Sequence, residues 1–417
     1  MRRILLCSTA VPWPNRPLLG IFHIHQAQAL RALGVEMALF SPSVAVPTWL
    51  GRAWPRLRDH AARPARYQID GVEVFAPRTR FVFPAFVRQR LVVARPDAVL
   101  RHADRRLARA LDATIARFEP DLLLGHGLVP WGDAIANAAS RFGIDHAFIE
   151  HSAGDVTRVQ PGSPLARALG DRARRARAVF VVGPQMLEHA STVLGWPNVV
   201  LLPNGALRAA PGERGSDAAR RRTVLAPANY SRRKGFEELV EAFGAIAAKH
   251  ADVELQLVTA APDSLRALIA ASPAKDRIAI RPPVPPRALL GLMAEAELLA
   301  LPSWSEAFGL VYVEALAAGT PVLCTTDSGF WQFAERWAAG GDVVPATAVP
   351  PHDAPALRAA LDALLADPAA AAREAASGRR MVDAWFSWQR NAEQLLETLG
   401  VAAAQRSVSP STSPSRR

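Results

Sequence analysis

The sequence predicts an α/β protein with two doubly wound, parallel-sheet domains. Short apolar runs that end in Pro, Gly or Ser alternate along the chain with segments of helical periodicity, which is typical of strand–helix–strand units. The length of 417 residues exceeds that of one ordinary domain, so two domains of roughly 200 residues each are expected. Because 50% of the residues are hydrophobic, both domains can bury a core.

The composition is that of a protein of the reducing cytoplasm. The two cysteines, Cys7 and Cys324, lie far apart in the sequence, so we expect no disulfide. Residues 2–10 begin with two arginines, but the apolar run that follows is short, which favours a first buried strand over a signal peptide. The sequence contains no run of about 20 apolar residues, so we expect no transmembrane helix.

The positive charge is concentrated in the first half of the chain. Residues 1–210 hold 27 Lys and Arg against 15 Asp and Glu, a net charge of +12, whereas the rest has a net charge of −1. No nucleic-acid-binding motif accompanies this charge, so we expect no nucleic acid partner. We expect instead a phosphate-bearing acceptor, or peripheral contact with the anionic inner face of the cytoplasmic membrane.

The sequence of the first half has the pattern of alternating strands and helices. It opens with a strand at Arg3–Ser8, a proline-rich loop at Thr9–Gly20, a helix at Phe22–Leu33 and a strand at Val35–Phe40. Residues 44–105 are irregular and rich in Pro, Arg and aromatic residues. The other elements predicted in this half are strands at Val72–Ala76, Leu122–Gly125, Ala147–Glu150 and Val179–Val182 and helices at Arg105–Phe118 and Pro130–Phe142.

The second half of the sequence also has the pattern of alternating strands and helices. Its first helix places Phe236, Leu239, Val240 and Phe243 three or four positions apart, so they share one face. The predicted strands are Val224–Pro227, Glu254–Thr259, Ile278–Arg281, Leu298–Leu301, Val322–Cys324 and Asp342–Pro345. The predicted helices are Phe236–Ala248, Asp263–Ala271, Pro286–Ala294, Leu310–Ala318 and Ala354–Leu365, with a last one within Met381–Leu399.

Changes in composition indicate where the domains begin and end. Residues 1–205 form the first predicted domain, and residues 206–222 form a polar, basic linker. Residues 223–380 form the second predicted domain, followed by a C-terminal helix over 381–400. Residues 401–417 are rich in Ser, Pro and Arg, so we expect a disordered tail.

Two acids, Glu306 and Glu314, flank the predicted helix that begins at Leu310. The first backbone N–H groups of a helix lack intrahelical partners and can bind a phosphate, and Gly309 lets a ligand approach the backbone closely. Glu306 could accept hydrogen bonds from sugar hydroxyls, and Glu314 could hold the paired hydroxyls of a ribose. Alternatively, Glu306 caps the helix and Glu314 is a solvated surface acid.

The segment SEAFGLVYVEALAAGTPVL resembles the paired-glutamate (E-x7-E) signature of the retaining glycosyltransferases of family 4, which have the GT-B fold. The resemblance implies an N-terminal acceptor domain and a C-terminal nucleotide-sugar donor domain, both Rossmann-like, that face an interdomain cleft. It implies that Glu306 contacts the donor sugar, that Glu314 binds the ribose, and that Phe308, Gly309 and Leu310 lie against the nucleotide. It also implies sugar transfer from a nucleotide-diphosphate sugar to a hydroxyl of a glycan or lipid-linked acceptor, in bacterial cell-surface polysaccharide or glycolipid synthesis.

A basic turn precedes the helix at Phe236. Three consecutive cations, Arg232, Arg233 and Lys234, could neutralise a diphosphate or form a solvated turn. In the family that the chain resembles, an Arg and a Lys at this place stabilise the leaving nucleotide. Lys234 matches, but Ala228 or Asn229 stands where the Arg is expected, so Arg232 or Arg233 could substitute for it.

Two histidines, His126 and His151, follow predicted strands at the edge where open α/β sheets bind ligands. A single histidine at such a place is more often structural. The pattern H-S-A-G-D at residues 151–155 resembles the family's histidine loop, whose histidine lies against the donor sugar, so His151 is the stronger catalytic candidate, beside Glu306 and Lys234. Further ligands at suitable spacing are missing, so we predict no metal and no other cofactor. The family resemblance also makes Gly20 the glycine that approaches the donor diphosphate.

The resemblance extends to Phe386-Ser387-Trp388, which is similar to the segment where the family's final helix returns to the first domain. It also places acceptor contacts within the variable residues 44–105. Two alternatives remain open: a nucleotide-sugar-binding GT-B protein without transfer activity, which the missing Arg leaves open, and a GT-B epimerase. A phosphorylase would need a lysine for pyridoxal phosphate, and the chain has very few lysines.

Overall fold

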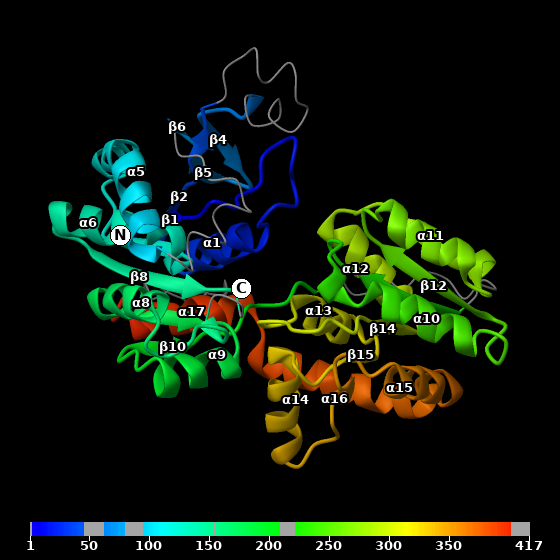
Figure 1. Ribbon diagram of the computed structural model, residues 1–417. Coiled ribbons are helices and arrows are strands. Elements are labelled where there is room, and N and C mark those ends of the chain that lie inside the picture. Colours follow the sequence, from blue (N-terminus) through cyan, green and yellow to red (C-terminus); the bar gives the residue numbers. More distant parts are fainter. Residues whose placement is uncertain (1, 46–61, 80–94, 153–155, 209–221, 402–417) are drawn as a thin grey trace, which may run out of the picture.

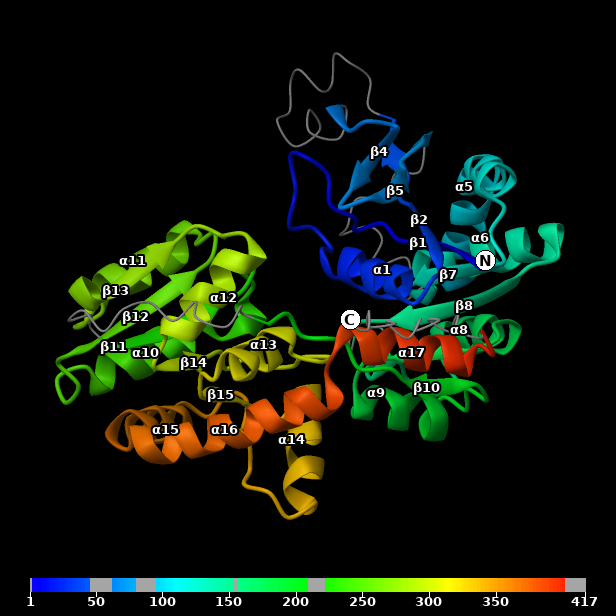
Figure 2. The same cartoon turned by 180° about the vertical axis from the view of Figure 1, so that it is seen from behind.

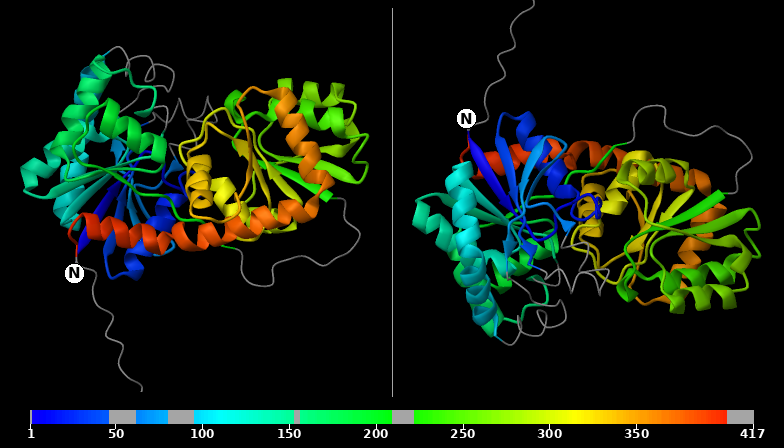
Figure 3. Two further views of the ribbon diagram at one scale, coloured as in Figure 1. Left: turned by 90° about the horizontal axis from the view of Figure 1, so that it is seen from below. Right: turned by 90° about the horizontal axis from the view of Figure 1, so that it is seen from above.

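The computed structural model has two lobes, each with one mainly parallel sheet between layers of helices (Figures 1 and 3). It describes residues 2–45, 62–79, 95–152, 156–208 and 222–401. The predicted fold class of two doubly wound, Rossmann-like units is therefore confirmed. Helices cover both faces of each sheet, which explains why the central strands are mainly apolar.

Within the described residues, the first sheet has eight strands in the order β10-β9-β8-β7-β1-β2-β5-β4. Neighbouring strands run parallel, except that β4 is antiparallel to β5. From β1 the chain continues to β2 on one side of it, and later forms β7 on the other side of β1. At such a switch point a crevice opens at the carboxyl ends of the strands. The bounds are β1 (Arg3–Cys7), β2 (Glu36–Phe40), β4 (Arg66–Ile69), β5 (Val72–Phe75), β7 (Leu122–His126), β8 (Asp145–Glu150), β9 (Val179–Val181) and β10 (Val199–Leu201).

Helices of the first lobe pack on both faces of this sheet. A separate two-stranded ladder joins β3 (Ser43–Val44) to β6 (Arg78–Thr79). The helix that follows β1 is preceded by Gly20, which has a φ of +62°. The helices are α1 (Phe22–Ala32), α5 (Pro96–Phe118), α6 (Leu128–Phe142), α8 (Pro164–Arg175) and α9 (Pro184–Glu188), the last continued by a π-helical turn at His189–Val193.

The second sheet is parallel throughout, with the order β13-β12-β11-β14-β15-β16. Its switch point lies between β11 and β14. The loops that follow these two strands therefore lie side by side at the crevice, and these are the loops that carry the basic turn and Glu306. The strands are β11 (Arg222–Pro227), β12 (Val253–Val258), β13 (Ile278–Arg281), β14 (Leu298–Ala300), β15 (Val322–Thr325) and β16 (Thr347–Val349).

The helices of the second lobe alternate with these strands along the chain. The predicted helix at Leu310–Ala318 is found with the same bounds, as α13. Short 3-10 turns occur at Arg232–Lys234 and Lys275–Arg277. The other helices are α10 (Phe236–Ile246), α11 (Asp263–Ala271), α12 (Pro286–Glu295), α14 (Gly329–Ala339) and α15 (Ala354–Ala366).

The last two helices connect the lobes. Helix α16 (Pro368–Trp385) packs against α13 in the second lobe, and α17 (Trp388–Thr398) packs against α1 in the first (Figure 2). The side-chain amide of Asn391 on α17 donates to the carbonyl of Pro203 at 2.8 Å and accepts from the Gln26 amide at 2.8 Å. These buried hydrogen bonds attach the end of the chain to the first lobe.

The predicted strand at Asp342–Pro345 is wrong. The last strand, β16, begins at Thr347, because Thr347 is the first residue in register with Leu323 of β15. Val343 and Val344 are 50% and 40% exposed, and the Asp342 carboxylate forms an ion pair with Arg380 at 2.6 Å. Two β-branched residues indicate a strand only where a neighbouring strand and a core are present to pack against.

Several helices begin earlier than predicted or were not predicted. Helix α5 starts at Pro96, nine residues before the expected Arg105, because its first two turns carry charged residues that conceal the apolar face. Helices α8, α14 and α16 were not predicted. The first two are capped by serine: the hydroxyls of Ser163 and Ser328 each accept a backbone N–H at 3.1 Å.

Some expectations concern residues outside those described. They are the disordered tail, apart from Val401, most of the linker at 206–222, residues 153–155 of the histidine loop and much of the predicted acceptor region at 44–105. In the part of that region that is described, a strand at β5 is confirmed and β4 was not predicted.

Candidate active site

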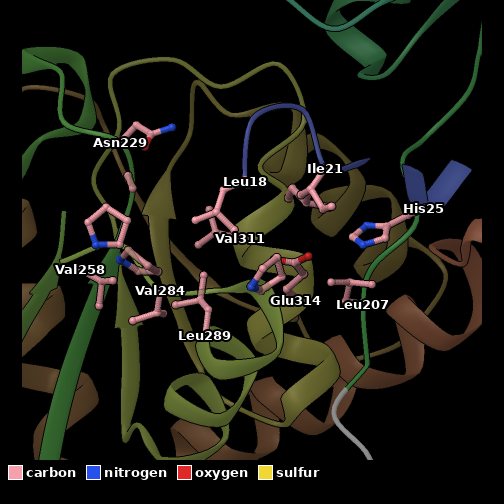
Figure 4. A pocket seen from close by; sticks show the side chains of 15 residues that line it. Leu18, Ile21, His25, Leu207, Asn229, Val258, Val284, Leu289, Val311 and Glu314 are labelled. Carbon is pink, nitrogen blue, oxygen red and sulfur yellow. The ribbon is translucent and has the colours of Figure 1, made fainter. Parts of the chain in front are cut away.

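A pocket of about 250 Å³ lies between the two lobes, beside α13 (Figure 4). The first lobe contributes Leu18, Ile21 and His25, from the loop before α1 and from α1 itself. The wall from the second lobe is mainly apolar, and among its described residues Glu314 is the one carboxylate. The lining residues used below are Leu207, from the segment between the lobes, and Asn229, Val284, Leu289, Leu310 and Glu314 of the second lobe.

Glu314 is the charged residue of an otherwise apolar helix. Helix α13 is buried between the lobes, and Glu314 lies in its second turn, half-buried and directed into the pocket (Figure 4). Burial raises the pKa of the Glu314 carboxyl to about 7. The backbone N–H of Leu207 donates a hydrogen bond to the carboxylate, which lowers the pKa and so opposes the effect of burial. This environment does not fit a solvated surface acid. A ligand with two adjacent hydroxyl groups would supply the donors that the carboxylate lacks.

The start of α13 has no side-chain cap. Its N-cap residue is Gly309, with a φ of +86°, so the first backbone N–H groups of the helix have no side-chain acceptor. A Cβ on Gly309 would lie 2.4 Å from the Tyr312 ring. Leu310 lines the pocket next to these groups, whereas Phe308 is buried against Phe386, with ring centroids 5.4 Å apart. Glu306 therefore does not cap the helix, and the positive helix end is available to an anion.

Lys234 and Glu306 form an ion pair across the crevice of the second lobe. They come from the loops after β11 and β14, at positions 72 residues apart, and their side chains are 25% and 16% exposed. Gly235, which follows Lys234, has a φ of +73° and approaches the carbonyl of Pro302 too closely for a side chain. The pair therefore combines the predicted cation for a diphosphate with the predicted acceptor for a sugar hydroxyl.

The other two cations of the basic turn do not join this pair. The Arg232 guanidinium pairs with Glu238 at 2.6 Å and lies over the Trp304 ring at 4.9 Å, so its charge is compensated at the start of α10. The Arg233 side chain is exposed. Asn229 is exposed at the rim of the pocket. The substitution of Arg232 or Arg233 for the missing arginine stays a prediction.

His151 and His126 lie together, and a third histidine joins them. The Nε2 atom of His151 is 2.8 Å from Nδ1 of His126, and their rings are nearly parallel. His126 is the last residue of β7 and is 8% exposed. The buried ring of His23, from the first turn of α1, lies 4.3 Å from the His126 ring. The Nδ1 atom of His23 donates to the carbonyl of Gly20 at 2.8 Å, so Gly20 holds the cluster as well as the turn.

The sequence patterns did not identify the contributions of α1. The segment LLGIFHIHQ contains His23, His25, Leu18 and Ile21, and its two histidines follow the loop after the first predicted strand. That position is a signal in the sequence for these residues, whereas the helical periodicity of the segment indicates only an apolar face. In the part of the chain that the structure describes, no group of three or more His, Cys, Asp and Glu residues could hold a metal ion.

Comparison with known proteins gives a family match over most of the chain. A family model described as "Family 4 Glycosyltransferase in conflict systems" matches residues 87–395. The chain is 41% identical to the D-inositol 3-phosphate glycosyltransferase of Nocardia farcinica over 143 residues, which are 34% of this chain and 30% of that protein. It is 27% identical to the putative teichuronic acid biosynthesis glycosyltransferase TuaC of Bacillus subtilis over 344 residues, 78% of this chain and 82% of TuaC. The match thus spans about a third of the Nocardia protein and most of TuaC.

Solved structures share the arrangement of both lobes. The sucrose-phosphate synthase of Thermosynechococcus elongatus superposes with a TM-score of 0.72 at 22% identity, over 96% of this chain and 98% of that chain. Anabaena HepE in complex with UDP and glucose superposes with a TM-score of 0.68 at 17% identity, over 96% and 100%. At these identities the likeness concerns the fold, and it confirms the GT-B arrangement of the two lobes.

The raised pKa of Glu314 predicts a dependence of stability on pH. A carboxyl whose pKa rises from 4.5 to about 7 on folding favours the folded state least when it is ionised, so stability falls as pH increases from about 4.5 to about 7. We expect Glu314→Gln, which is neutral at all pH values, to raise the melting temperature of the ligand-free protein by a few degrees at pH 8. The gain should shrink towards zero at pH 5, as measured by differential scanning calorimetry.

Glu397→Gln, at an exposed position of α17, is the matched control for the loss of one carboxylate. It should leave the pH dependence of the wild-type protein in place. If Glu314→Gln behaved like this control at both pH values, Glu314 would be a solvated acid.

Proposed function

This chain belongs to the family 4 glycosyltransferases, and we propose that it is a retaining enzyme that transfers a sugar from a nucleotide-diphosphate sugar to a hydroxyl of a glycan or lipid-linked acceptor. The observation that carries the proposal is the placement of Glu314 in the pocket, with the uncapped start of α13 and the Lys234–Glu306 pair in the loops at the carboxyl edge of the second sheet. These groups suit, in that order, the ribose, the diphosphate and the sugar of such a donor. Similarity to TuaC supports a role in cell-surface polysaccharide synthesis.

The nucleoside suits the pocket beside Glu314. Two adjacent ribose hydroxyls can each donate to one oxygen of the carboxylate. The apolar surface of Val284 and Leu289 can cover a planar base. Structures of this fold with UDP and glucose, or with a UDP-2-fluoro glucose, make a UDP-sugar the first donor to test.

The diphosphate suits the start of α13 and Lys234. Transfer breaks the bond between the anomeric carbon and the diphosphate oxygen, and negative charge develops on that oxygen. Backbone N–H groups at Gly309 and Leu310 and the Lys234 ammonium are fixed in place before the reaction, so they stabilise this charge without reorganisation.

The acceptor hydroxyl approaches from the first lobe in this proposal. Its oxygen forms the new bond to the anomeric carbon on the face that the diphosphate leaves, and its proton passes to a departing phosphate oxygen. Glu306 orients the sugar by accepting hydrogen bonds from its hydroxyls. His151 lies at the carboxyl edge of the first sheet, and burial lowers its pKa to about 3, so it acts as a neutral hydrogen-bonding group.

Substitutions of the two glutamates should separate binding from turnover. Glu314→Ala removes a ribose contact that is common to ground and transition states, so we expect weaker nucleotide binding. Glu306→Ala removes a contact at the reacting sugar, so we expect mainly a lower kcat. Calorimetric titration with UDP and steady-state turnover of a radiolabelled UDP-sugar measure the two effects. Wild-type kinetics in both variants would refute the site assignment, and binding without turnover in the wild-type protein would favour a nucleotide-sugar-binding protein without transfer activity.

His151→Ala should lower transfer with little change in nucleotide affinity. Misplacement of a group next to the reacting centre can cost about 10²-fold in rate. The base and ribose are expected to bind in the second lobe, so the dissociation constant for UDP should stay near the wild-type value. Unchanged turnover in a folded variant would make the histidine purely structural.

The basic first lobe supports peripheral contact with an anionic surface. No helix in the described ranges is long and apolar enough to cross a membrane. Helix α5 exposes Arg101, Arg105, Arg106 and Arg109 on the side opposite its buried apolar residues. Such a cluster attracts anionic lipid headgroups within roughly a Debye length.

Charge reversal on α5 tests this contact. We expect the wild-type protein to sediment with vesicles that contain anionic lipid at low salt and to be released at a few hundred millimolar salt, where the Debye length falls to roughly 5 Å. Arg105→Glu with Arg106→Glu should abolish sedimentation. Arg373→Glu with Arg379→Glu makes the same charge change on an exposed face of the second lobe and should not. Equal binding to neutral vesicles would refute the electrostatic contact.

A further inference from the structure

Three imidazole rings from three separate elements meet at the carboxyl edge of the first sheet. They are His23 in the first turn of α1, His126 at the end of β7 and His151 just after β8. Strands β7 and β8 are neighbours, with His126 in register with Ile149, so alternation along β8 returns His151 to the side that His126 occupies. The Phe22 ring, 4.9 Å from the His151 ring, packs against the same group.

All three imidazoles are neutral in this environment. Burial is the main cause that lowers the pKa of each ring: to about 4 for His23, well below 6.5 for His126 and to about 3 for His151. A neutral imidazole carries one N–H donor and one bare nitrogen acceptor. The cluster must therefore have a definite arrangement of protons, and the contacts restrict which one it is.

The His126–His151 contact allows two arrangements. One of the nitrogens 2.8 Å apart, Nδ1 of His126 or Nε2 of His151, carries the proton that lies between them. The other nitrogen of His126, Nε2, is buried and has no hydrogen-bond partner among the described residues. If His151 donated, His126 would carry its proton on Nε2, as a buried N–H without an acceptor. If His126 donates from Nδ1, only a bare nitrogen is left unpaired, and orphaned buried N–H groups are the rarer case in native proteins.

We propose that His126 is a positioning residue that fixes the tautomer of His151, by donating its Nδ1–H to Nε2 of His151. His151 then carries its own proton on Nδ1, and this N–H is the donor that it can offer to an oxygen of the substrate. The inference deepens the proposed function and rests on it, because it assigns the state of the histidine expected beside the donor sugar. His23 supports the arrangement from the other side: its Nδ1–H is held by the Gly20 carbonyl, and its ring packs edge-on against His126.

The assignment excludes one chemical role and predicts another. Because Nε2 of His151 accepts from His126, that nitrogen is not free to take a proton from an acceptor hydroxyl. His151 instead positions the sugar as a hydrogen-bond donor, and His126 acts through it without touching the substrate. Replacement of His126 should therefore alter kcat while the nucleotide, bound in the other lobe, keeps its affinity.

The tautomers can be observed without any turnover. In protein labelled with ¹⁵N-histidine, we expect His126 to show a protonated Nδ1 and a bare Nε2, and His151 a protonated Nδ1 and a bare Nε2, from pH 6 to pH 8. Spectra of His126→Asn and His151→Asn assign the signals. A protonated Nε2 on either ring, or an imidazolium in this range, would overturn the proposal.

Substitutions that mimic one nitrogen at a time give the second test. The side-chain NH₂ of asparagine stands near the Nδ1 position of histidine, and that of glutamine near Nε2. We expect His126→Asn to keep kcat within about threefold of wild type, and His126→Gln and His126→Phe to lower it about 10-fold or more, since the support of a reacting group is lost. His146→Phe is the matched control: His146 is a buried histidine of the same lobe, with an unpaired Nε2, at the opposite end of β8.

Together, the NMR spectra and the kinetics of the variants separate the failure of this inference from the failure of the proposed function. A wild-type protein that binds UDP but transfers no sugar would refute the function, and the NMR assignment of the tautomers would still decide the arrangement of protons. An active enzyme in which Asn, Gln and Phe at position 126 are equivalent would refute the positioning role. UDP affinity and melting temperature, measured for each variant, distinguish loss of positioning from loss of folding.

Discussion

The position of one carbonyl group, that of Ala307, constrains the cleft and both of its walls. A Cβ added to Gly183 in the first lobe or to Gly329 in the second would lie 2.2 or 2.1 Å from the Ala307 oxygen, so side chains are excluded on both sides. The preceding carbonyl, of Glu306, accepts a backbone N–H from Gly329 at 2.9 Å and the Gln185 side-chain amide at 3.1 Å. The loop that carries the Glu306 side chain and starts α13 is thus held by both lobes at once. Its geometry depends on how the lobes pack, and the packing of the lobes depends on it.

Several of the groups that this packing brings together cost stability. The Glu314 carboxyl is buried enough to raise its pKa, and the helix start at Gly309 has no side-chain cap. Nε2 of His126 has no hydrogen-bond partner in the part of the chain that the structure describes. Each of these features costs stability in the free protein. The surrounding apolar core, in which β1, β7 and β8 are almost fully buried and α13 buries five of its nine residues, compensates for that cost. A ligand with paired hydroxyls and an anionic group would relieve the first two, which is the expected pattern for a site built for binding rather than for stability.

Patterns local in the sequence predicted the fold, and they also selected the residues of the candidate site. Helix α13 and strand β13 have the predicted bounds because glycine and proline punctuate short apolar runs at both. Glu306 and Glu314 could be selected because they lie close together in the sequence, on either side of the glycine that precedes the predicted helix. The helix start has no side-chain cap, which argues against Glu306 as the cap. Glu314 is half-buried and lines the pocket, which argues against a solvated surface acid.

What the sequence did not predict depends on contacts between distant segments. The partner of Lys234 is 72 positions away, and the compensation of Arg232 by Glu238 and Trp304 depends on where α10 starts in space. His23 lies on a face of α1 whose other residues are mainly apolar, so the sequence pattern of that face indicates only core packing. The strand expected at Asp342–Pro345 failed for the same reason, since its two valines have no neighbouring strand to pack against.

The missing arginine can be understood from the same contacts. With Ala228 or Asn229 where a second cation would stand and Arg232 already paired, Lys234 is the cation of the basic turn that lies in the crevice, where it pairs with Glu306. A diphosphate alone would have to compete with Glu306 for Lys234. A nucleotide sugar would not, because its hydroxyls supply donors to Glu306 and release the ammonium to the phosphate. In the proposed reaction the ion pair would therefore couple recognition of the sugar to stabilisation of the leaving group, because the Lys234 charge would become available at the reacting bond only when both parts of the donor are present.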